Sequence, residues 1–179
     1  MTKLLLIVGM PGCGKGEFIN IANGFGYTPV VMGDIVREET VKRGREIKES
    51  GMVAQQLRME NGNSAIAMLT IPRLKDGRKY IIDGIRGYSE VLEFKKQFDS
   101  VIVGIHCAPS LRFQRLYDRE REDDPSDYEE FTERDHRELG FGIGDAIALS
   151  DMMIINEDGL DDFQDRCKEV LRKLEKDEY

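Results

Sequence analysis

The sequence has few of the residues that build disulfide frameworks and thiolate or imidazole metal centres. Three cysteines and two histidines occur among its 179 residues, with no CxxC or HExxH pattern. The cysteines, Cys13, Cys107 and Cys167, are far apart in the chain, which predicts small buried side chains and neither a disulfide nor a metal role. No Ser-His-Asp arrangement accompanies His106 or His136, so a histidine-based hydrolase is not indicated.

Long apolar runs are also missing. The first apolar stretch ends at Gly9, which is too soon for a secretory signal, and no run approaches the roughly 20 apolar residues of a membrane span. We therefore expect a cytoplasmic protein without a membrane partner.

Positive charge is in deficit. The net charge is −8 and the isoelectric point about 4.9, although charged residues make up 34% of the chain, against roughly 25% on average. This balance disfavours nucleic-acid binding, which needs a basic surface. It leaves open a small anionic ligand held by a few local arginines. The length is that of one domain, spanning residues 1–179.

Short aliphatic runs alternate with helical patterns. The runs are continuously apolar, which is typical of parallel strands buried on both faces. An α/β fold is therefore expected, with ligands at the carboxyl ends of the strands. The expected strands are Leu4–Val8, Thr28–Val31, Tyr80–Ile82, Val101–His106 and Met152–Ile155, and the expected helices are Lys15–Ala22, 34–44, a stretch through Leu74, Ser89–Gln97, Leu111–Arg121, Tyr128–Leu139 and Leu160–Lys176.

The two longest segments between predicted strands each begin at the carboxyl end of a strand. They run from residue 32 to 79 and from residue 107 to 151. Two insertions at one edge of a parallel sheet predict two flaps around one ligand. We expect an acceptor-binding insertion at about 34–66 and a lid at about 112–137.

A phosphate-binding loop follows the first predicted strand and opens the first helix. The order G-x-x-x-x-G-K lets backbone amides curl around a phosphate while the lysine reaches its outer oxygens. The loop, with the next residue, comprises Gly9, Met10, Pro11, Gly12, Cys13, Gly14, Lys15 and Gly16. Gly16 has no hydroxyl for a metal, so we expect Mg²⁺ at Asp83, an acid that ends an apolar strand.

Several motifs resemble those of the adenylate kinase-like nucleoside monophosphate kinases. The loop form Gly-x-Pro-Gly-x-Gly-Lys-Gly is shared, although Glu17 stands where those kinases usually have threonine, and the Gly33–Arg37 segment is similar to their Gly-Asp-x-x-Arg. The resemblance implies that Arg37 and Arg86 hold the acceptor, together with Asp34. It also implies a three-layer P-loop NTPase fold with a five-stranded parallel sheet in the order 2-3-1-4-5.

Other segments extend the resemblance over nearly the whole chain. Residues 148–156 resemble the last strand of dephospho-CoA kinase, which would place Asn156 near the adenine. Glu17, directly after the P-loop, is also expected at the cofactor. The chain also resembles an archaeal group of kinase-like P-loop proteins. In the lid, Arg115 and Arg119 share one helix face, and the segment from Arg121 is similar to the family's Arg-x-Asp-Asp stretch. The family's further arginine would be Arg134 or Arg137.

These features predict a kinase that moves the γ-phosphoryl group of ATP, with Mg²⁺, to a nucleotide-like small molecule. Lys15, Asp83, Arg115, Arg119, Arg121 and Arg134 are the expected catalytic residues. A monophosphate acceptor needs no base, whereas a hydroxyl acceptor does, and Asp34 is then the expected base. The alternative is a nucleotide-binding ATPase that acts as a regulatory switch. RNA binding by the arginine-rich helix is disfavoured by the acids around it.

Overall fold

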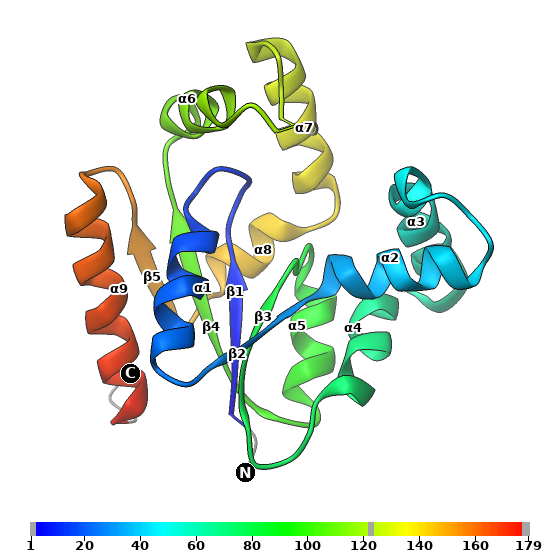
Figure 1. Ribbon diagram of the computed structural model, residues 1–179, viewed down its shortest axis with the longest axis horizontal. Helices are drawn as coiled ribbons and strands as arrows, with labels where there is room; N and C mark the ends of the chain where they lie inside the picture. Colours follow the sequence, from blue (N-terminus) through cyan, green and yellow to red (C-terminus); the bar gives the residue numbers. More distant parts are fainter. Residues whose placement is uncertain (1–2, 122–123, 177–179) are drawn as a thin grey trace.

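The protein is built around one parallel sheet. A computed structural model describes residues 3–121 and 124–176. The sheet order is β2-β3-β1-β4-β5, and every neighbouring pair is parallel. The predicted α/β fold and strand order are thereby confirmed (Figure 1). The strands are β1 Lys3–Val8, β2 Thr28–Val31, β3 Lys79–Asp83, β4 Asp99–His106 and β5 Met152–Ile155.

The apolar run of β1 is buried because helices cover both faces of the sheet. Leu5 and Ile7 point into one hydrophobic cluster, whereas Leu4, Leu6 and Val8 point into the other. This alternation follows from the two-residue period of a strand. A strand covered on both faces needs apolar residues at every position, as the continuous run predicted.

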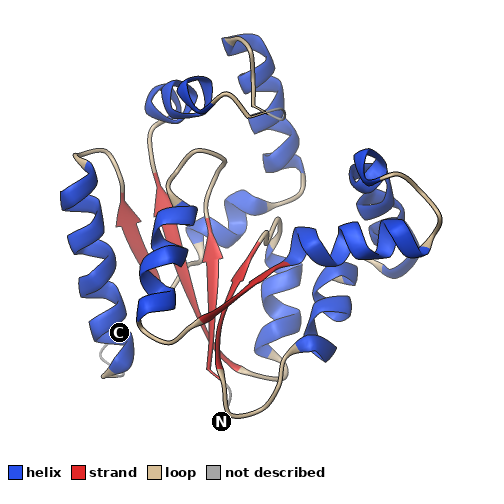
Figure 2. Ribbon diagram, in the orientation of Figure 1, coloured by secondary structure: helices blue, strands red, loops and turns tan. Residues whose placement is uncertain are grey.

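Two helical layers complete the fold (Figure 2). On one face lie α1 (Lys15–Gly24) and α9 (Leu160–Glu175), which contribute Phe18 and Phe163 to the core. On the other face lie α4 (Ala65–Thr70), α5 (Tyr88–Lys95) and α8 (Ile143–Ala148). Helix α8 was not predicted, because its six residues are too short to show a helical period.

The two insertions stand at the carboxyl edge of the sheet. The first contains α2 (Met32–Lys42), the 3₁₀ helix η1 (Ile47–Glu49) and α3 (Ser50–Asn61), then leads through α4 to the 3₁₀ helix η2 (Ile71–Arg73). The second contains α6 (Pro109–Arg119) and α7 (Tyr128–Gly140). Figure 1 shows α6 and α7 above the strand ends, with α2 and α3 projecting to one side.

Two predicted helices begin two residues earlier than expected, and several other helix ends shift by one or two residues. Helix α2 begins at Met32 and not at residue 34, so it follows β2 directly. Helix α6 begins at Pro109 and not at Leu111, because proline has no amide hydrogen and is favoured in the first turn. Two residues of the predicted Arg-x-Asp-Asp stretch, Glu122 and Asp123, lie outside the described residues.

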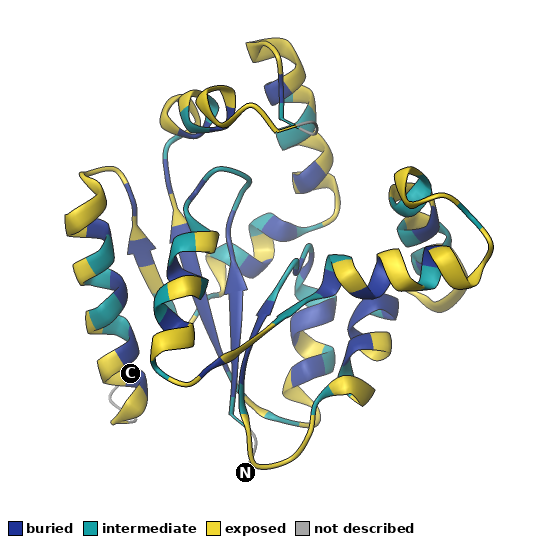
Figure 3. Cartoon of the chain, in the orientation of Figure 1, coloured by how far each residue is buried: buried dark blue, intermediate teal, exposed yellow. Residues whose placement is uncertain are grey.

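Burial follows the three layers. The central strands β1, β3 and β4 are largely buried, the edge strands β2 and β5 are partly exposed, and the outer faces of α6 and α7 are exposed (Figure 3). Cys13, Cys107 and Cys167 are buried in the core on the α1 and α9 face, as expected for small apolar side chains. In the ranges 3–121 and 124–176, no helix combines the length and the apolar character that crossing a bilayer requires.

Candidate active site

The loop between β1 and α1 adopts backbone angles that favour glycine. Gly12 and Gly14 have φ of +81° and +108°, in the left-handed region. A Cβ at Gly14 would lie 2.4 Å from Nδ2 of Asn156, and one at Gly12 would lie 2.9 Å from the carbonyl oxygen of Arg112. The glycines of the motif therefore permit both the turn and the close approach of other elements.

We expect Gly14→Ala to destabilise the fold, whereas Gly16→Ala leaves it intact. The first substitution meets a strained φ and a steric contact, at a cost of about 1–3 kcal/mol. Gly16 is helical, and an alanine Cβ at this position would have no atom within 4 Å, so the substitution is neutral or stabilises by up to about 1 kcal/mol. Urea denaturation of the two variants checks this. Equal free energies of unfolding would contradict the steric role of Gly14.

Lys15 lies across the loop that carries it. Its Nζ donates to the carbonyl oxygens of Gly9 at 2.7 Å and Met10 at 3.4 Å, and contacts Sγ of Cys13 at 4.0 Å. All three partners are uncharged. The ammonium group thus sits at the start of α1, where the helix dipole adds positive potential, without a neutralising carboxylate among these contacts.

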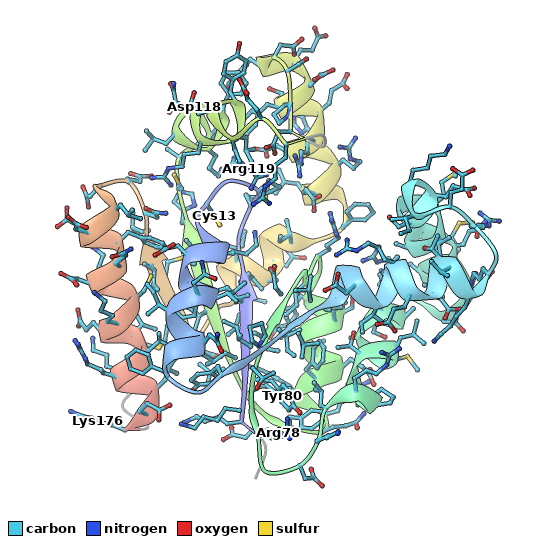
Figure 4. All side chains as sticks on the ribbon, viewed as in Figure 1. Cys13, Arg78, Tyr80, Asp118, Arg119 and Lys176 are labelled. Atoms are coloured by element: carbon cyan, nitrogen blue, oxygen red, sulfur yellow. The ribbon has the colours of Figure 1, made fainter. Side chains whose placement is uncertain are left out.

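A cavity of about 540 Å³ opens beside this loop. It brings together residues from the P-loop, β2, β3, both lid helices and α8. Cys13 and Arg119 lie at this edge of the sheet, whereas Arg78, Tyr80 and Lys176 lie at the opposite edge (Figure 4). The lining includes Gly9, Pro11, Gly12, Gly14, Lys15, Gly16, Glu17, Gly33, Arg37, Asp83, Arg86, Arg115, Arg119, Arg121, Arg134, Glu138 and Ile143.

Asp83 ends β3 on the wall of this cavity. Its Oδ1 is the one buried side-chain nitrogen or oxygen without a hydrogen-bond partner in the described part of the chain. Buried polar atoms are nearly always paired, so this oxygen fits a cation or a metal-bound water. No group of three His, Cys, Asp or Glu side chains could hold a metal within those same residues. A cation at Asp83 would therefore need phosphate or water oxygens as further ligands.

The lid arginines that the sequence singled out reach the cavity. Arg115 donates to Oδ1 of Asn156 at 3.4 Å and to Sγ of Cys107 at 3.3 Å. Arg119 donates through Nε to Asp124 at 2.8 Å, and Nη1 of Arg134 lies 3.6 Å from the same carboxylate. The hydrogen bond from Arg119 lowers the pKa of Asp124 below its ordinary value. Arg119 and Arg134 thus both interact with the carboxylate of Asp124. Arg121 also lines the cavity.

Arg112 fastens the lid to the P-loop, a role that the sequence did not reveal. It is buried, and its guanidinium donates to the carbonyl oxygens of Cys107 and Pro11, both at 3.1 Å. It also donates to both carboxylate oxygens of Asp135 in α7, at 2.9 Å through Nη1. The guanidinium carbon lies 5.0 Å from the ring centre of Phe131. One side chain thereby joins the end of β4, the loop and α7.

The acceptor-side arginines both pair with acids. Arg37 pairs with Asp34 one turn earlier in α2, and Nη1 of Arg86 pairs with Oε1 of Glu138 in α7. The role expected of Asp34 at the acceptor stays a prediction; its side chain is 58% exposed and absent from the cavity lining. Since α2 starts at Met32, Asp34 lies within its first turn, where it pairs with Arg37. Glu138 lines the cavity instead.

A buried acid, Glu90, holds the loop that carries Arg86. Its Oε2 accepts from the amide of Arg86 at 2.7 Å, and its Oε1 accepts from Arg58 of α3 at 3.1 Å. Burial raises the pKa of Glu90 above its ordinary value. The ring of Phe141 lies 5.3 Å from the guanidinium of Arg58 and 6.0 Å from that of Arg86. Glu90 therefore connects the first insertion to the cavity wall that carries Arg86.

The raised pKa of Glu90 predicts a pH dependence of stability. A carboxyl group whose pKa is raised on folding contributes stability fully below its unfolded pKa, and this contribution is lost as pH rises through the folded pKa. Relative to Glu90→Gln, the wild-type free energy of unfolding should therefore increase as pH falls from about 7 towards the ordinary value of 4.5. Urea denaturation across this range checks the sign. A constant difference, or one that shrinks on acidification, would contradict it.

A second cavity, of about 320 Å³, adjoins the start of α1. Nδ2 of Asn156 donates to the carbonyl oxygen of Cys13 at 2.8 Å, which ties the end of β5 to the P-loop. Glu17 accepts from Nε2 of Gln164 at 2.7 Å and lines both cavities. Met10 and Cys13 are absent from both linings. The second cavity is lined by Gly14, Glu17, Arg115, Asn156, Asp158, Leu160 and Phe163.

Comparison with known proteins classifies the chain. The family model described as an AAA domain matches residues 8–132. UPF0200 proteins of Methanocaldococcus jannaschii and Methanopyrus kandleri are each 45% identical to it, over 97% and 96% of this chain and 93% and 90% of theirs. The protein belongs to the UPF0200 family. Another UPF0200 protein, from Thermococcus sibiricus, is 41% identical over 96% of this chain and 95% of its own.

Solved structures show that the UPF0200 fold is that of P-loop kinases. Dephospho-CoA kinase from Campylobacter jejuni superimposes with a TM-score of 0.65 over the whole of both chains, at 14% identity. Shikimate kinase from Acinetobacter baumannii, in complex with shikimate, gives 0.59 over 98% of this chain and 93% of its own, at 13% identity. The predicted resemblance to P-loop kinases is confirmed in the fold. At such identities the likeness concerns the fold alone.

Proposed function

We propose that this UPF0200 protein is an ATP-dependent phosphotransferase that moves the γ-phosphoryl group to a small, nucleotide-like acceptor. One observation carries the proposal. A single cavity brings the P-loop lysine and an unpaired carboxylate oxygen together with arginines from both insertions. Phosphoryl transfer depends on positioning and on neutralising charge, which this set of groups supplies. Cytoplasmic location and the lack of nucleic-acid or membrane partners stay predictions.

The donor side of the proposed reaction lies at the P-loop. The loop amides and Lys15 hold the β- and γ-phosphates, and the second cavity beside Asn156 takes the base. Asp83 holds Mg²⁺ through the oxygen that lacks a protein partner. The ion supplies neutralisation of phosphate charge when it is bound. Arg115, which lines both cavities, would contact the phosphates between base and acceptor.

Arg119, Arg121 and Arg134 would neutralise charge on the moving phosphoryl group. Arg119 and Arg134 share Asp124, whose side chain is only 2% exposed. Because a carboxylate holds the two guanidinium groups in place, they are ordered before the substrate arrives. Because these positive charges are already in position, little reorganisation of the site is needed during the reaction.

ADP release in the presence of ATP and Mg²⁺ tests the proposal. The acceptor panel contains nucleoside monophosphates and hydroxyl compounds such as dephospho-CoA and shikimate. At least one acceptor class should raise the rate clearly above the rate with water. If every acceptor leaves ADP release at the water rate, the kinase proposal is wrong.

A second candidate function is ATP hydrolysis coupled to a conformational change. The ion pairs that occupy Arg37 and Arg86 favour it, because a water nucleophile needs no acceptor-binding arginine. In that case Arg37→Ala would leave turnover unchanged, while Lys15→Ala would abolish nucleotide binding. For a kinase, Arg37→Ala should raise the KM for the acceptor and leave the ADP release seen with water unaffected.

A further inference from the structure

The way charge is distributed around the large cavity points to the chemical class of the acceptor. We propose that the group phosphorylated is a hydroxyl and not a phosphate, and that Glu138 accepts its proton. This inference rests on the proposed phosphotransferase function and names its acceptor class and its base. It assigns the role of base to Glu138 of α7, whereas the sequence indicated Asp34 in the first insertion.

On the donor side, two cationic groups, Lys15 and Arg115, have uncharged partners, whereas Arg119 and Arg134 share Asp124. Lys15 contacts two carbonyl oxygens and a sulfur, and Arg115 contacts a side-chain amide oxygen and a sulfur. Within residues 3–121 and 124–176, neither of them forms an ion pair with a carboxylate. Their positive charges are therefore available to an anionic ligand, as the phosphates of a nucleotide require.

On the acceptor side, by contrast, both arginines have carboxylate partners. Arg37 pairs with Asp34, and Arg86 pairs with Glu138, so these four groups together carry no net charge. A phosphate monoester that approached either arginine would meet a carboxylate beside it. The repulsion is strongest at Glu138, whose side chain is only 9% exposed, and weaker at Asp34, which is 58% exposed and screened by water. An uncharged acceptor group avoids this penalty.

Glu138 is the carboxylate best placed to act as the base. Its side chain is only 9% exposed, it lies in the last turn of α7, and it lines the cavity. Three carboxylates appear in that lining. Asp83 fits the cation, and Glu17 is held by Gln164 at the mouth of the second cavity. Of these three, only Glu138 forms an ion pair with an acceptor-side arginine, Arg86.

The contact with Arg86 fixes Glu138 and leaves one oxygen for chemistry. Oε1 accepts from Arg86, whose own amide is anchored on Glu90. A base whose orientation is set by a second group is the usual arrangement for general-base catalysis. In the proposed step, the hydroxyl proton passes to Oε2 of Glu138 as the acceptor oxygen bonds to the γ-phosphorus. The bond from that phosphorus to the β–γ bridging oxygen breaks, and ADP leaves with the electron pair.

The first test identifies the bond that is formed. Each acceptor that raises ADP release is followed by ³¹P NMR, which separates a phosphate monoester from a phosphoanhydride by chemical shift. We expect a monoester from a hydroxyl acceptor and no anhydride from AMP, CMP, GMP or UMP. An anhydride product would overturn the inference while leaving the phosphotransferase proposal intact. Failure of every acceptor would overturn both.

The second test uses binding and so does not depend on finding the acceptor. The full chain is saturated with a non-hydrolysable ATP analogue and Mg²⁺, and AMP is titrated calorimetrically. We expect weak AMP binding by the wild type and binding at least about tenfold tighter by Glu138→Gln, because removal of one carboxylate frees Arg86 for the phosphate. Glu133→Gln, on the same helix and outside the cavity lining, is the matched control and should bind as the wild type does.

The two variants also separate a base from a merely structural residue. With a hydroxyl acceptor, Glu138→Gln should lower kcat by about 10²–10⁴-fold and remove the acidic limb of the pH–rate profile, while Glu133→Gln preserves both. Tight AMP binding by the wild type, or an unchanged pH profile in Glu138→Gln, would show that Glu138 does not have this role.

Discussion

Lys15→Ala should reduce phosphoryl transfer from ATP by about 10²–10³-fold or more, as expected when a preorganised charge at the transferring group is removed. The ammonium group contacts uncharged atoms of its own loop. Its positive charge has no carboxylate partner among these contacts, so the variant should fold normally. Steady-state ADP release and calorimetric ATP binding measure the loss.

A matched substitution separates charge from packing. Lys42 ends α2 at an exposed position, away from the cavity lining. Lys42→Ala removes the same charge and should leave ATP binding and turnover unchanged. If Lys15→Ala and Lys42→Ala were equally active, the P-loop would not be the donor site.

Arg112→Met should destabilise the protein by about 3–5 kcal/mol, the usual cost of leaving a buried partner charge uncompensated. The side chain of Arg112 is 4% exposed and that of Asp135 is 15% exposed. Removal of the guanidinium leaves Asp135 without this partner and frees two carbonyl oxygens, one of them in the P-loop. The free energy of unfolding from urea denaturation measures the effect.

The double variant Arg112→Met with Asp135→Leu tests the cause. Replacing both members of a buried ion pair by apolar groups is often neutral, so much of the lost stability should return. Turnover should stay low, because the lid is then no longer tied to Pro11. If the single variant is as stable as the wild type, Arg112 does not fasten α7 to the loop.

Much of the framework was predictable because it depends on local patterns. The continuous apolar run before Gly9 identified a strand covered on both faces, and glycine and lysine spacing identified the phosphate loop. Both signals are contained within a short stretch of chain. The convergence of Arg37, Arg86 and Arg115 on one cavity was also foreseeable, since carboxyl ends of parallel strands share one edge.

The pairings within the site were not predictable from the sequence. Arg112 and Asp135 are separated by 23 residues, and Arg86 and Glu138 by 52. Both partners lie among many similar charges, so no spacing distinguishes a buried pair from a solvated one. The ion pair between Asp34 and Arg37 was likewise not foreseen, although the two residues are one helical turn apart. Helix α2 starts at Met32, earlier than expected, which places Asp34 in its first turn.

A crystal structure of the chain with Mg²⁺ and a non-hydrolysable ATP analogue tests the central proposal most directly. The β- and γ-phosphates should lie on the amides of residues 9–16 with Lys15, the ion should lie beside Asp83, and the base should occupy the cavity next to Asn156 and Phe163. The γ-phosphate should then face Glu138 across the large cavity. An analogue bound elsewhere, or phosphates that avoid Lys15, would contradict the account.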